Sequence, residues 1–220
     1  SGHAVKPDLA IRLLHQCRHA ALATQSQPCP GYPYATAIQF VCDERHRPIF
    51  VASTLAEHSK NLLSDGRVSL SLLTPGADAA QSASRMTLLA DAERIDAPDA
   101  LRRRLLRYLP EAEDWLMLDF LFFRLHPKRA RLIAGLGTMG WLDGNAWDSL
   151  PILNLDTEAR LLRDAQSALP PSIRLLGCDG FGADWMEKGD YRRTDWSEPT
   201  TEAATLRERL LQLTPSRDRK

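Results

Sequence analysis

The sequence predicts a mainly β domain followed by a small α+β unit. Short apolar runs of strand length, separated by Pro, Gly and Asp, occupy most of the chain up to residue 134. An amphipathic helical pattern precedes them, and a segment rich in Gly, Asp and Asn follows over residues 135–151. We therefore expect one domain over residues 1–150 and a second over residues 151–220.

The first domain combines antiparallel strands with short helices. Asp8, directly after Pro7, is the expected N-cap of a helix whose apolar stripe runs to about Ala20. Strand-like runs cover residues 20–24, 34–42, 48–53, 67–73, 85–95, 120–125 and 131–134. Helical spacing of apolar residues recurs over residues 55–65, 98–109 and 111–118. Segment 74–84, rich in Ala, Gly and Ser, is the expected loop.

The second domain has fewer elements. We expect a helix over residues 156–169, capped by Asp156, and a strand over residues 172–178. A tight turn at residues 179–180 follows, and a final helix, capped by Thr200 or Thr201, extends to residue 213.

Composition limits the partners. The chain has 44% hydrophobic and 25% charged residues, which is typical of a globular protein. Lys plus Arg and Asp plus Glu number 28 each, so no overall field attracts nucleic acid or an anionic membrane, and no apolar run approaches the roughly 20 residues of a membrane span. The four cysteines are far apart and form no C-x-x-C pair, which argues against a zinc site or a disulfide framework. These features favour a cytoplasmic protein without a structural metal.

Residues 50–63 carry the strongest chemical signal. A strand delivers the hydroxyls of Ser53 and Thr54 directly into a helix start, where backbone N–H groups and the helix dipole favour an anion. Ser59 and Lys60 can add a hydroxyl donor and a full positive charge, so a phosphate monoester suits this end. The alternative is that Ser53 or Thr54 is only an N-cap and Lys60 a solvated residue.

Four motifs occur together in order: Leu22-Ala-Thr24, Gly31-Tyr-Pro-Tyr-Ala-Thr36, Ser53 through Leu62, and Arg85-Met-Thr-Leu-Leu-Ala90. The set resembles the pyridoxamine 5'-phosphate oxidase-like FMN-binding proteins, and within them the haem iron utilisation branch. The resemblance implies a six-stranded split β-barrel with a small C-terminal α+β domain. It also implies a homodimer with FMN in the cleft between the subunits.

The resemblance also assigns residues to the cofactor. Those expected to hold the FMN phosphate are Ser53, Thr54, Ser59 and Lys60. Those expected beside the flavin ring or the ribityl chain, or reaching the cofactor from a neighbouring strand, are Tyr34, Ala35, Thr36, Gln81 and Arg85. His58 and Asn61, one helical turn away, either touch the ligand or tie the loop together.

The function implied is an FMN-dependent oxidoreductase acting on a small substrate, with the flavin supplying the chemistry. One alternative is a haem-binding or haem-degrading protein on the same barrel, which needs an axial ligand. The haem-handling relatives carry that histidine near the C terminus, whereas the last histidine of this chain is His126, followed by Pro127. A second alternative is a non-catalytic flavin sensor.

Two further patterns are weaker. Residues 135–140 match G-x-G-x-x-G, but the residues that follow make a poor helix and cannot present a dipole to a pyrophosphate. His15 and His19 are four residues apart on the first expected helix and could clamp a metal ion, although two ligands are too few and a solvated helix face is favoured.

Overall fold

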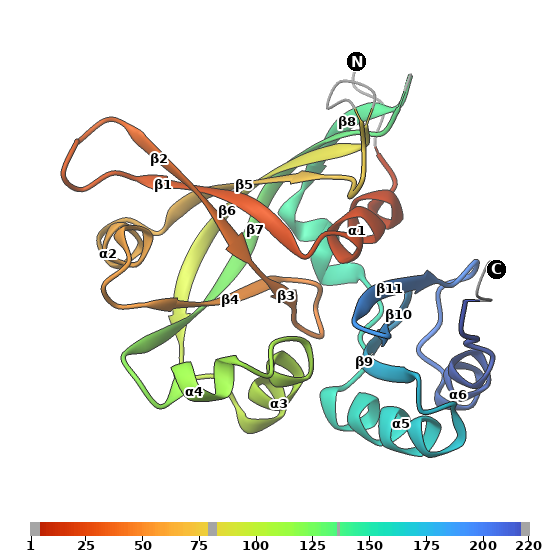
Figure 1. Cartoon of the computed structure of the whole chain (residues 1–220). Helices are drawn as coiled ribbons and strands as arrows, with labels where there is room; N and C mark the ends of the chain where they lie inside the picture. The colour runs from red at the N-terminus through yellow and green to blue at the C-terminus, as the bar shows by residue number, and fades with distance from the viewer. Residues whose placement is uncertain (1–4, 79–82, 136, 217–220) are drawn as a thin grey trace. The chain divides into compact units, whose positions relative to one another are not determined.

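The computed structural model describes residues 5–78, 83–135 and 137–216 (Figure 1). The chain forms two compact units. The barrel unit contains residues 1–97 and 111–150, and the C-terminal unit contains residues 98–110 and 151–220. Segment 98–110, which contains the helix expected over residues 98–109, groups with the C-terminal unit. Whether the two units fold as separate domains stays a prediction.

The barrel unit is built on one antiparallel sheet. Its elements are α1 (Pro7–Gln16), β1 (His19–Gln25), β2 (Pro33–Gln39), β3 (Val41–Cys42), β4 (Pro48–Ser53), α2 (Glu57–Ser64), β5 (Arg67–Leu73), β6 (Arg85–Ile95), α4 (Ala112–Leu116), β7 (Phe120–Ile133), β8 (Met139–Asp143) and the 3-10 helix η1 (Gly144–Ser149). The strand order is β2-β1-β5-β6-β7-β4-β3, and β8 pairs with β7. The sheet curls strongly (Figure 1), which confirms the expected split barrel. It has eight strands within the described residues, where the resemblance implies six.

Alternation of apolar and polar residues fixes which face of the sheet is buried. Leu22 on β1, Leu70 on β5 and Leu88 on β6 lie opposite one another in the register and are fully buried. Phe50 on β4 stacks on Phe123 of β7, with ring centroids 5.4 Å apart. The outward residues of the same strands therefore form the second face of the sheet.

The first helix is shorter than expected. α1 ends at Gln16, and its N-cap is Lys6, so Asp8 lies inside the first turn. The chain turns extended at His19 because this residue pairs with Gln39 in the β1–β2 ladder. Pairing between strands outweighs the local helical pattern here.

β7 is one long strand, although the sequence suggested two. Pro127 lies inside it, at a register shift where Leu89 faces Arg129 and Ala90 faces Pro127. Lys128 is thus the additional residue of a β-bulge, the position in a sheet where proline is tolerated.

The Gly-, Asp- and Asn-rich segment before the expected domain boundary contains β8 and η1. Gly144 joins them and packs closely against β7, because a Cβ atom at this position would lie 2.1 Å from the Pro127 carbonyl oxygen. Only glycine fits this contact.

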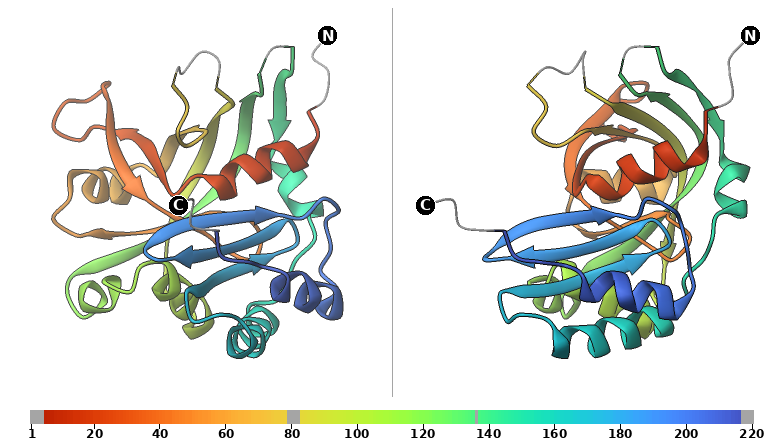
Figure 2. Two further views of the ribbon diagram at one scale, coloured as in Figure 1. Left: turned by 45° about the vertical axis from the view of Figure 1, so that its right-hand side comes forward. Right: turned by 90° about the vertical axis from the view of Figure 1, so that its right-hand side faces the viewer.

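The C-terminal unit contains α3 (Asp99–Tyr108), α5 (Leu155–Ala168), β9 (Ile173–Asp179), β10 (Gly182–Glu187), β11 (Asp190–Asp195) and α6 (Ala203–Leu211). Its antiparallel sheet has the order β11-β10-β9, with α5 and α6 against one face (Figure 2). The cap of α5 is Asn154, whose side chain accepts from the N–H groups of Asp156 and Thr157, so Asp156 is not the N-cap. Glu202 rather than a threonine precedes α6.

A buried ion pair ties α3 to α5. Arg104 donates to Glu158 with both side chains almost fully buried, and Arg107 donates to the second Glu158 oxygen at 2.6 Å. The Cys178 N–H also donates to Glu158, at 2.8 Å. Burial opposes the charge on Arg104, but the neighbouring carboxylates outweigh it and raise its pKa well above its ordinary value.

A second buried carboxylate continues this network. Asp184 accepts from the hydroxyls of Tyr108 and Tyr191, each at 2.5 Å, and Arg193 bridges Asp184 and Asp179. Burial raises the pKa of Tyr108 well above its usual value, which keeps this phenol a donor.

No helix in the described part of the chain is long and apolar enough to cross a membrane.

Candidate functional site

The start of α2 is an uncapped helix end. Its N-cap residue, Ala56, has no side-chain oxygen, so the first backbone N–H groups lack a side-chain acceptor. The Ser53 hydroxyl accepts from the Leu55 N–H at 3.2 Å. Lys60 is about half exposed and lies 3.7 Å from Glu57, a loose ion pair. Lys60 and the helix end can therefore meet an anion from solvent.

Two of the expected ligand residues lie deeper in α2. Ser59 is fully buried, and its hydroxyl is a buried polar group without a hydrogen-bond partner among the described residues. Asn61 donates to the Thr24 hydroxyl at 3.0 Å and accepts from the Gln27 N–H at 3.0 Å. Asn61 thus ties α2 to β1, which is the structural alternative to contact with the ligand.

His58 lies on the same turn. Its ring centroid is 6.4 Å from that of Phe50, and burial lowers its pKa below the ordinary histidine value. His58 is therefore biased toward the neutral imidazole.

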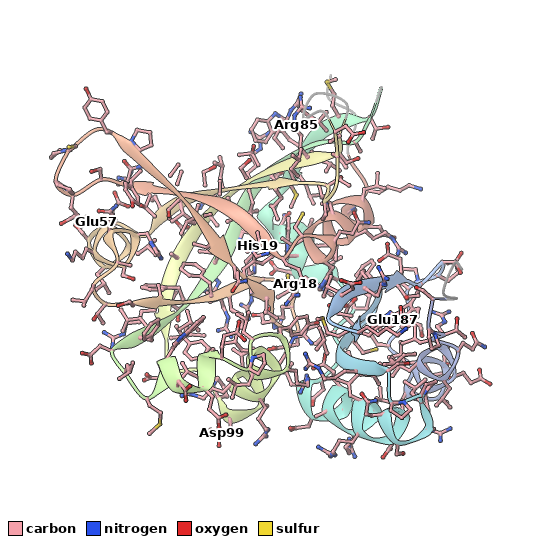
Figure 3. The ribbon with its side chains drawn as sticks, viewed as in Figure 1. Arg18, His19, Glu57, Arg85, Asp99 and Glu187 are labelled. Carbon is pink, nitrogen blue, oxygen red and sulfur yellow. The ribbon has the colours of Figure 1, made fainter. Side chains whose placement is uncertain are left out.

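The remaining expected residues are more dispersed. Tyr34 and Ala35 are exposed on β2, and Thr36 beside them is partly buried. Arg85 begins β6, well away from Glu57 on the first turn of α2 (Figure 3). Gln81 lies outside the described residues. Within one chain, Ser53 and Thr54 precede α2, which contains Ser59 and Lys60, and Arg85 lies distant from its first turn (Figure 3).

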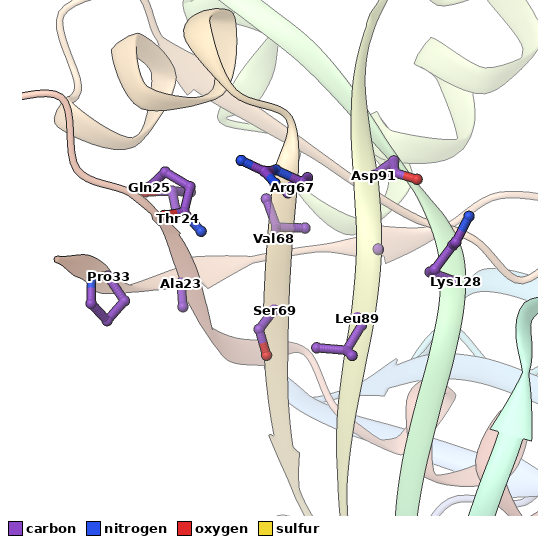
Figure 4. Close-up of a pocket in the computed structure, with 11 residues that line it drawn as sticks. Ala23, Thr24, Gln25, Pro33, Arg67, Val68, Ser69, Leu89, Asp91 and Lys128 are labelled. Atoms are coloured by element: carbon purple, nitrogen blue, oxygen red, sulfur yellow. The ribbon is translucent and has the colours of Figure 1, made fainter. Parts of the chain in front are cut away.

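A groove lies on the outer face of the sheet. It encloses about 520 Å3 and is lined by Ala23, Thr24, Gln25, Pro33, Arg67, Val68, Ser69, Leu89, Ala90, Asp91 and Lys128. Ala23, Ser69 and Leu89 face one another across three strands and form a mainly apolar floor (Figure 4). The charged groups Arg67, Asp91 and Lys128 lie toward one end (Figure 4). The groove is therefore amphipathic.

A second hollow lies beside the groove and shares Lys128 with it. It encloses about 460 Å3 and is lined by Arg47, His126, Pro127, Lys128, Asp143, Gly144, Asn145, Trp147 and Asp148. His126 faces Asp91 in the β6–β7 register, and its ring nitrogen lies 2.6 Å from a Glu93 carboxylate oxygen. The bulge at Lys128 thus separates two adjoining hollows.

The cations lining these hollows differ in their pairing. Arg67 pairs with Asp65 at 2.6 Å, and Arg47 pairs with Asp43 at 2.9 Å. Lys128 makes no ion pair with any residue that the structure describes. Its ammonium group is available to an anionic ligand.

Sequence reasoning missed the groove and its lysine. Arg67, Leu89 and Lys128 come from strands that are distant in sequence, and nothing local indicates that these strands are neighbours. The internal His126-Pro127 pair in a strand-like run was the available signal, since proline inside a sheet marks a bulge.

The first histidine pair is arranged differently from expectation. His15 is not on a solvated helix face: it is buried and lies 2.8 Å from a ring nitrogen of His46. His19 is on β1, so the two histidines do not share a helix face.

These features belong to a known class. Residues 8–134, more than half of the chain, match the family described as pyridoxamine 5'-phosphate oxidase, and the chain belongs to that family. The chloroplastic haem oxygenase HOZ of Arabidopsis thaliana is 36% identical over 120 residues, which are 53% of this chain and 36% of HOZ. The matched region thus spans about a third of that relative.

Two solved structures match nearly the whole chain. A protein of unknown function from Agrobacterium tumefaciens has a TM-score of 0.70 and 25% identity over 96% of each chain. A haem-binding protein from Mycobacterium smegmatis has a TM-score of 0.60 and 23% identity, over 96% of this chain and 100% of that one. At this identity the second similarity shows the fold alone.

Proposed function

We propose that this protein binds haem on the outer face of its barrel sheet and acts in haem oxygenation. The carrying observation is the amphipathic groove, in which an apolar floor adjoins the ammonium of Lys128, a group without an ion-pair partner among the described residues. Haem has a matching chemistry, because its macrocycle is apolar and its two propionates are anionic. The 36% identity with a haem oxygenase supports this choice over other planar ligands. Bound haem would supply the iron that binds dioxygen.

The groove residues would contact different parts of the haem. Leu89 and Ala23 can bury part of the macrocycle, at about 25 cal/mol for each Å2 of apolar surface removed from water. Lys128 can pair with a propionate without breaking an ion pair to any described residue, whereas Arg67 must share its charge with Asp65. Lys128 is therefore the cation expected to contribute more.

FMN is the second candidate, and the α2 start favours it. The helix end lacks a side-chain cap, Lys60 is only loosely paired, and Ser53 and Thr54, at the end of β4 and in the turn after it, offer hydroxyls. These groups fit a phosphate. On this alternative the protein is an FMN-dependent oxidoreductase or a flavin sensor, as the sequence motifs imply.

We also propose that a second copy of the chain covers the outer sheet face. Ala37, Ala21 and Ser71 form one row across β2, β1 and β5, all exposed, and the next row, which includes Ala23, is equally small. Such a flat surface suits close packing, and a partner would enclose the open groove. Cofactor affinity should then fall on dilution to monomer, which sedimentation of the loaded protein at falling concentration would measure.

Parallel titrations with haemin and FMN, followed by absorbance and flavin fluorescence, test the proposal. We expect saturable haem binding, weakened in Lys128→Ala by about 1.5–3 kcal/mol for a lost charge-assisted contact. Lys60→Ala should weaken FMN binding by about the same amount if α2 holds the phosphate. Lys6→Ala, an exposed lysine outside both sites, is the matched control.

The outcomes separate the two ligands. Saturable FMN binding that depends on Lys60, without haem binding, would replace the haem proposal with the flavin one. Haem binding that Lys128→Ala and Lys6→Ala change equally would remove the groove from the site.

A further inference from the structure

A cluster of two arginines and a tryptophan lies on the outer face of the barrel sheet, next to the groove. Arg129 and Arg131 project outward from β7, because Ala130 and Leu132 between and beside them are buried in the core. Trp141, an exposed residue of β8, lies directly opposite Arg131. The guanidinium carbon of Arg129 is 4.2 Å from the centroid of the Trp141 ring, and that of Arg131 is 5.6 Å from it. Two positive charges therefore share one indole ring.

The two arginines differ in their pairing. Arg129 lies 3.4 Å from a carboxylate oxygen of Asp143, so part of its charge is already neutralised. Arg131 is partly buried, yet it makes no hydrogen bond or ion pair with any residue that the structure describes. A guanidinium has five N–H donors in one plane, and stacking on an aromatic ring leaves the edge of that plane open. Arg131 can therefore bind an anion without giving up a described partner.

Arg131 is within reach of a ligand in the groove. Leu89, which lines the groove, lies opposite Arg129 in the β6–β7 register. Arg131 is thus the diagonal neighbour of Leu89, and such positions are about 7–8 Å apart. Thr87, the β6 residue directly opposite Arg131, is exposed and small. The apolar floor at Leu89 therefore continues toward the guanidinium without a bulky β6 side chain beside it.

Lys128 and Arg131 lie along the same strand. Three residues of extended chain span at most about 10 Å, and both side chains are long and flexible. Their charges can therefore meet two anionic groups on one edge of a ligand. Haem has such an edge, because its two propionates are on neighbouring pyrrole rings. A ligand with a single anionic group would use only one of these cations.

This inference rests on the proposed function. We propose that Arg131 is the second anion-binding residue of the haem site, and that Trp141 is the positioning residue that orients its guanidinium. The ligand lies with its two carboxylates along β7, one at Lys128 and the other at Arg131, and with its apolar edge toward Ala23 on β1. The site therefore selects a planar dicarboxylate over planar ligands that carry one negative charge or none.

The test titrates the full chain with two probes, haemin and haemin dimethyl ester, in which both propionates are uncharged. The wild type should bind haemin at least about tenfold more tightly than the ester, which corresponds to about 1.4 kcal/mol. Arg131→Ala should weaken haemin binding by about tenfold and leave ester binding unchanged. Arg131→Lys keeps the charge but loses the planar fork, so it should recover part of the loss. Arg94→Ala changes an exposed arginine of β6 that lines neither hollow, and this control should leave both affinities unchanged.

Trp141→Leu gives a readout that a merely structural role would not change. Without the indole ring, the Arg131 guanidinium keeps its charge but loses its fixed orientation. The ratio of the haemin affinity to the ester affinity should therefore fall toward the ratio of Arg131→Ala. Damage to the fold would instead lower both affinities together, and circular dichroism reports the fold.

The outcomes separate this inference from the proposed function. A wild type that does not bind haemin contradicts the proposed function. A wild type that binds haemin and its ester equally, or an Arg131→Ala variant that keeps the wild-type ratio of affinities, overturns the role of Arg131 and leaves haem binding in place. If Arg131→Ala lowers the ratio and Trp141→Leu does not, the role of Trp141 alone is overturned.

Discussion

Replacing Glu158 with Gln should destabilise the C-terminal unit strongly. The Glu158 carboxylate is 1% exposed and holds both Arg104 and Arg107, and it also accepts from the Cys178 N–H. Glutamine keeps one oxygen acceptor but removes the negative charge paired directly with Arg104, which is only 3% exposed. Breaking a buried ion pair in this way costs about 3–5 kcal/mol.

That loss is large compared with the total stability of a domain, about 5–15 kcal/mol. It corresponds to a decrease of the folding equilibrium constant by about two to three and a half powers of ten. Urea denaturation followed by circular dichroism and tryptophan fluorescence measures it, because Trp185 and Trp196 are buried in this unit. With a slope of about 2 kcal/mol/M, the midpoint should fall by roughly 1.5–2.5 M.

The control is Asp164→Asn on the same helix. Asp164 is exposed, and substitutions of this kind change the free energy of unfolding by less than about 0.5 kcal/mol. If Glu158→Gln lowers the free energy of unfolding by less than about 1 kcal/mol, the Arg104–Glu158 pair contributes no more than a surface ion pair, and the reasoning is refuted.

Three smaller predictions follow from the barrel unit. Cys29, the exposed thiol, should react first with Ellman's reagent in the native protein. Burial raises the pKa of Cys17 to about 11, so Cys17 should react only after denaturation. Rapid labelling of Cys17 in the native protein would contradict this prediction. Asn61→Ala should cost about 1–3 kcal/mol in thermal denaturation because it leaves the Thr24 hydroxyl without its donor, and a change within error would exclude that role. Because burial lowers the pKa of His58 in the folded state, its contribution to stability should be present above about pH 6.5 and should fall as the pH decreases toward the lowered value. Denaturation between pH 5 and 8 should show a smaller pH dependence in His58→Gln, and equal profiles would reject the shift.

Much of the barrel could be predicted because its strands are either alternating or short continuous apolar runs. The runs 48–53, 67–73 and 85–95 agree with β4, β5 and β6 residue for residue. Residues 67–73 and the first half of 85–95 alternate between the core and the outer face, whereas 48–53 is a short continuous apolar run bounded by Pro48. The start of α2 could also be predicted from the sequence, because the hydroxyl residues Ser53 and Thr54 directly precede a run with helical spacing.

Other elements depend on contacts that a local pattern cannot contain. β11 reads Asp-Tyr-Arg-Arg-Thr-Asp and has no apolar alternation, yet it pairs fully with β10 and buries Arg193 against Asp179. Helix 98–109 was expected in the first domain, and its ties to α5 and the second sheet, such as the buried Arg104–Glu158 pair, have no local sequence signal. The groove could not be predicted either, because its floor comes from β1, β5 and β6.

The most direct test of the haem proposal is to locate the bound cofactor by nuclear magnetic resonance. Ferric haem is paramagnetic and broadens the amide signals of nearby residues. Titration of 15N-labelled protein with haemin should first broaden amides around the groove, among them Ser69, Leu89 and Lys128. Gallium protoporphyrin, a diamagnetic control, should shift these signals without broadening them. Broadening confined to the start of α2, or no broadening at saturating haemin, would contradict the account.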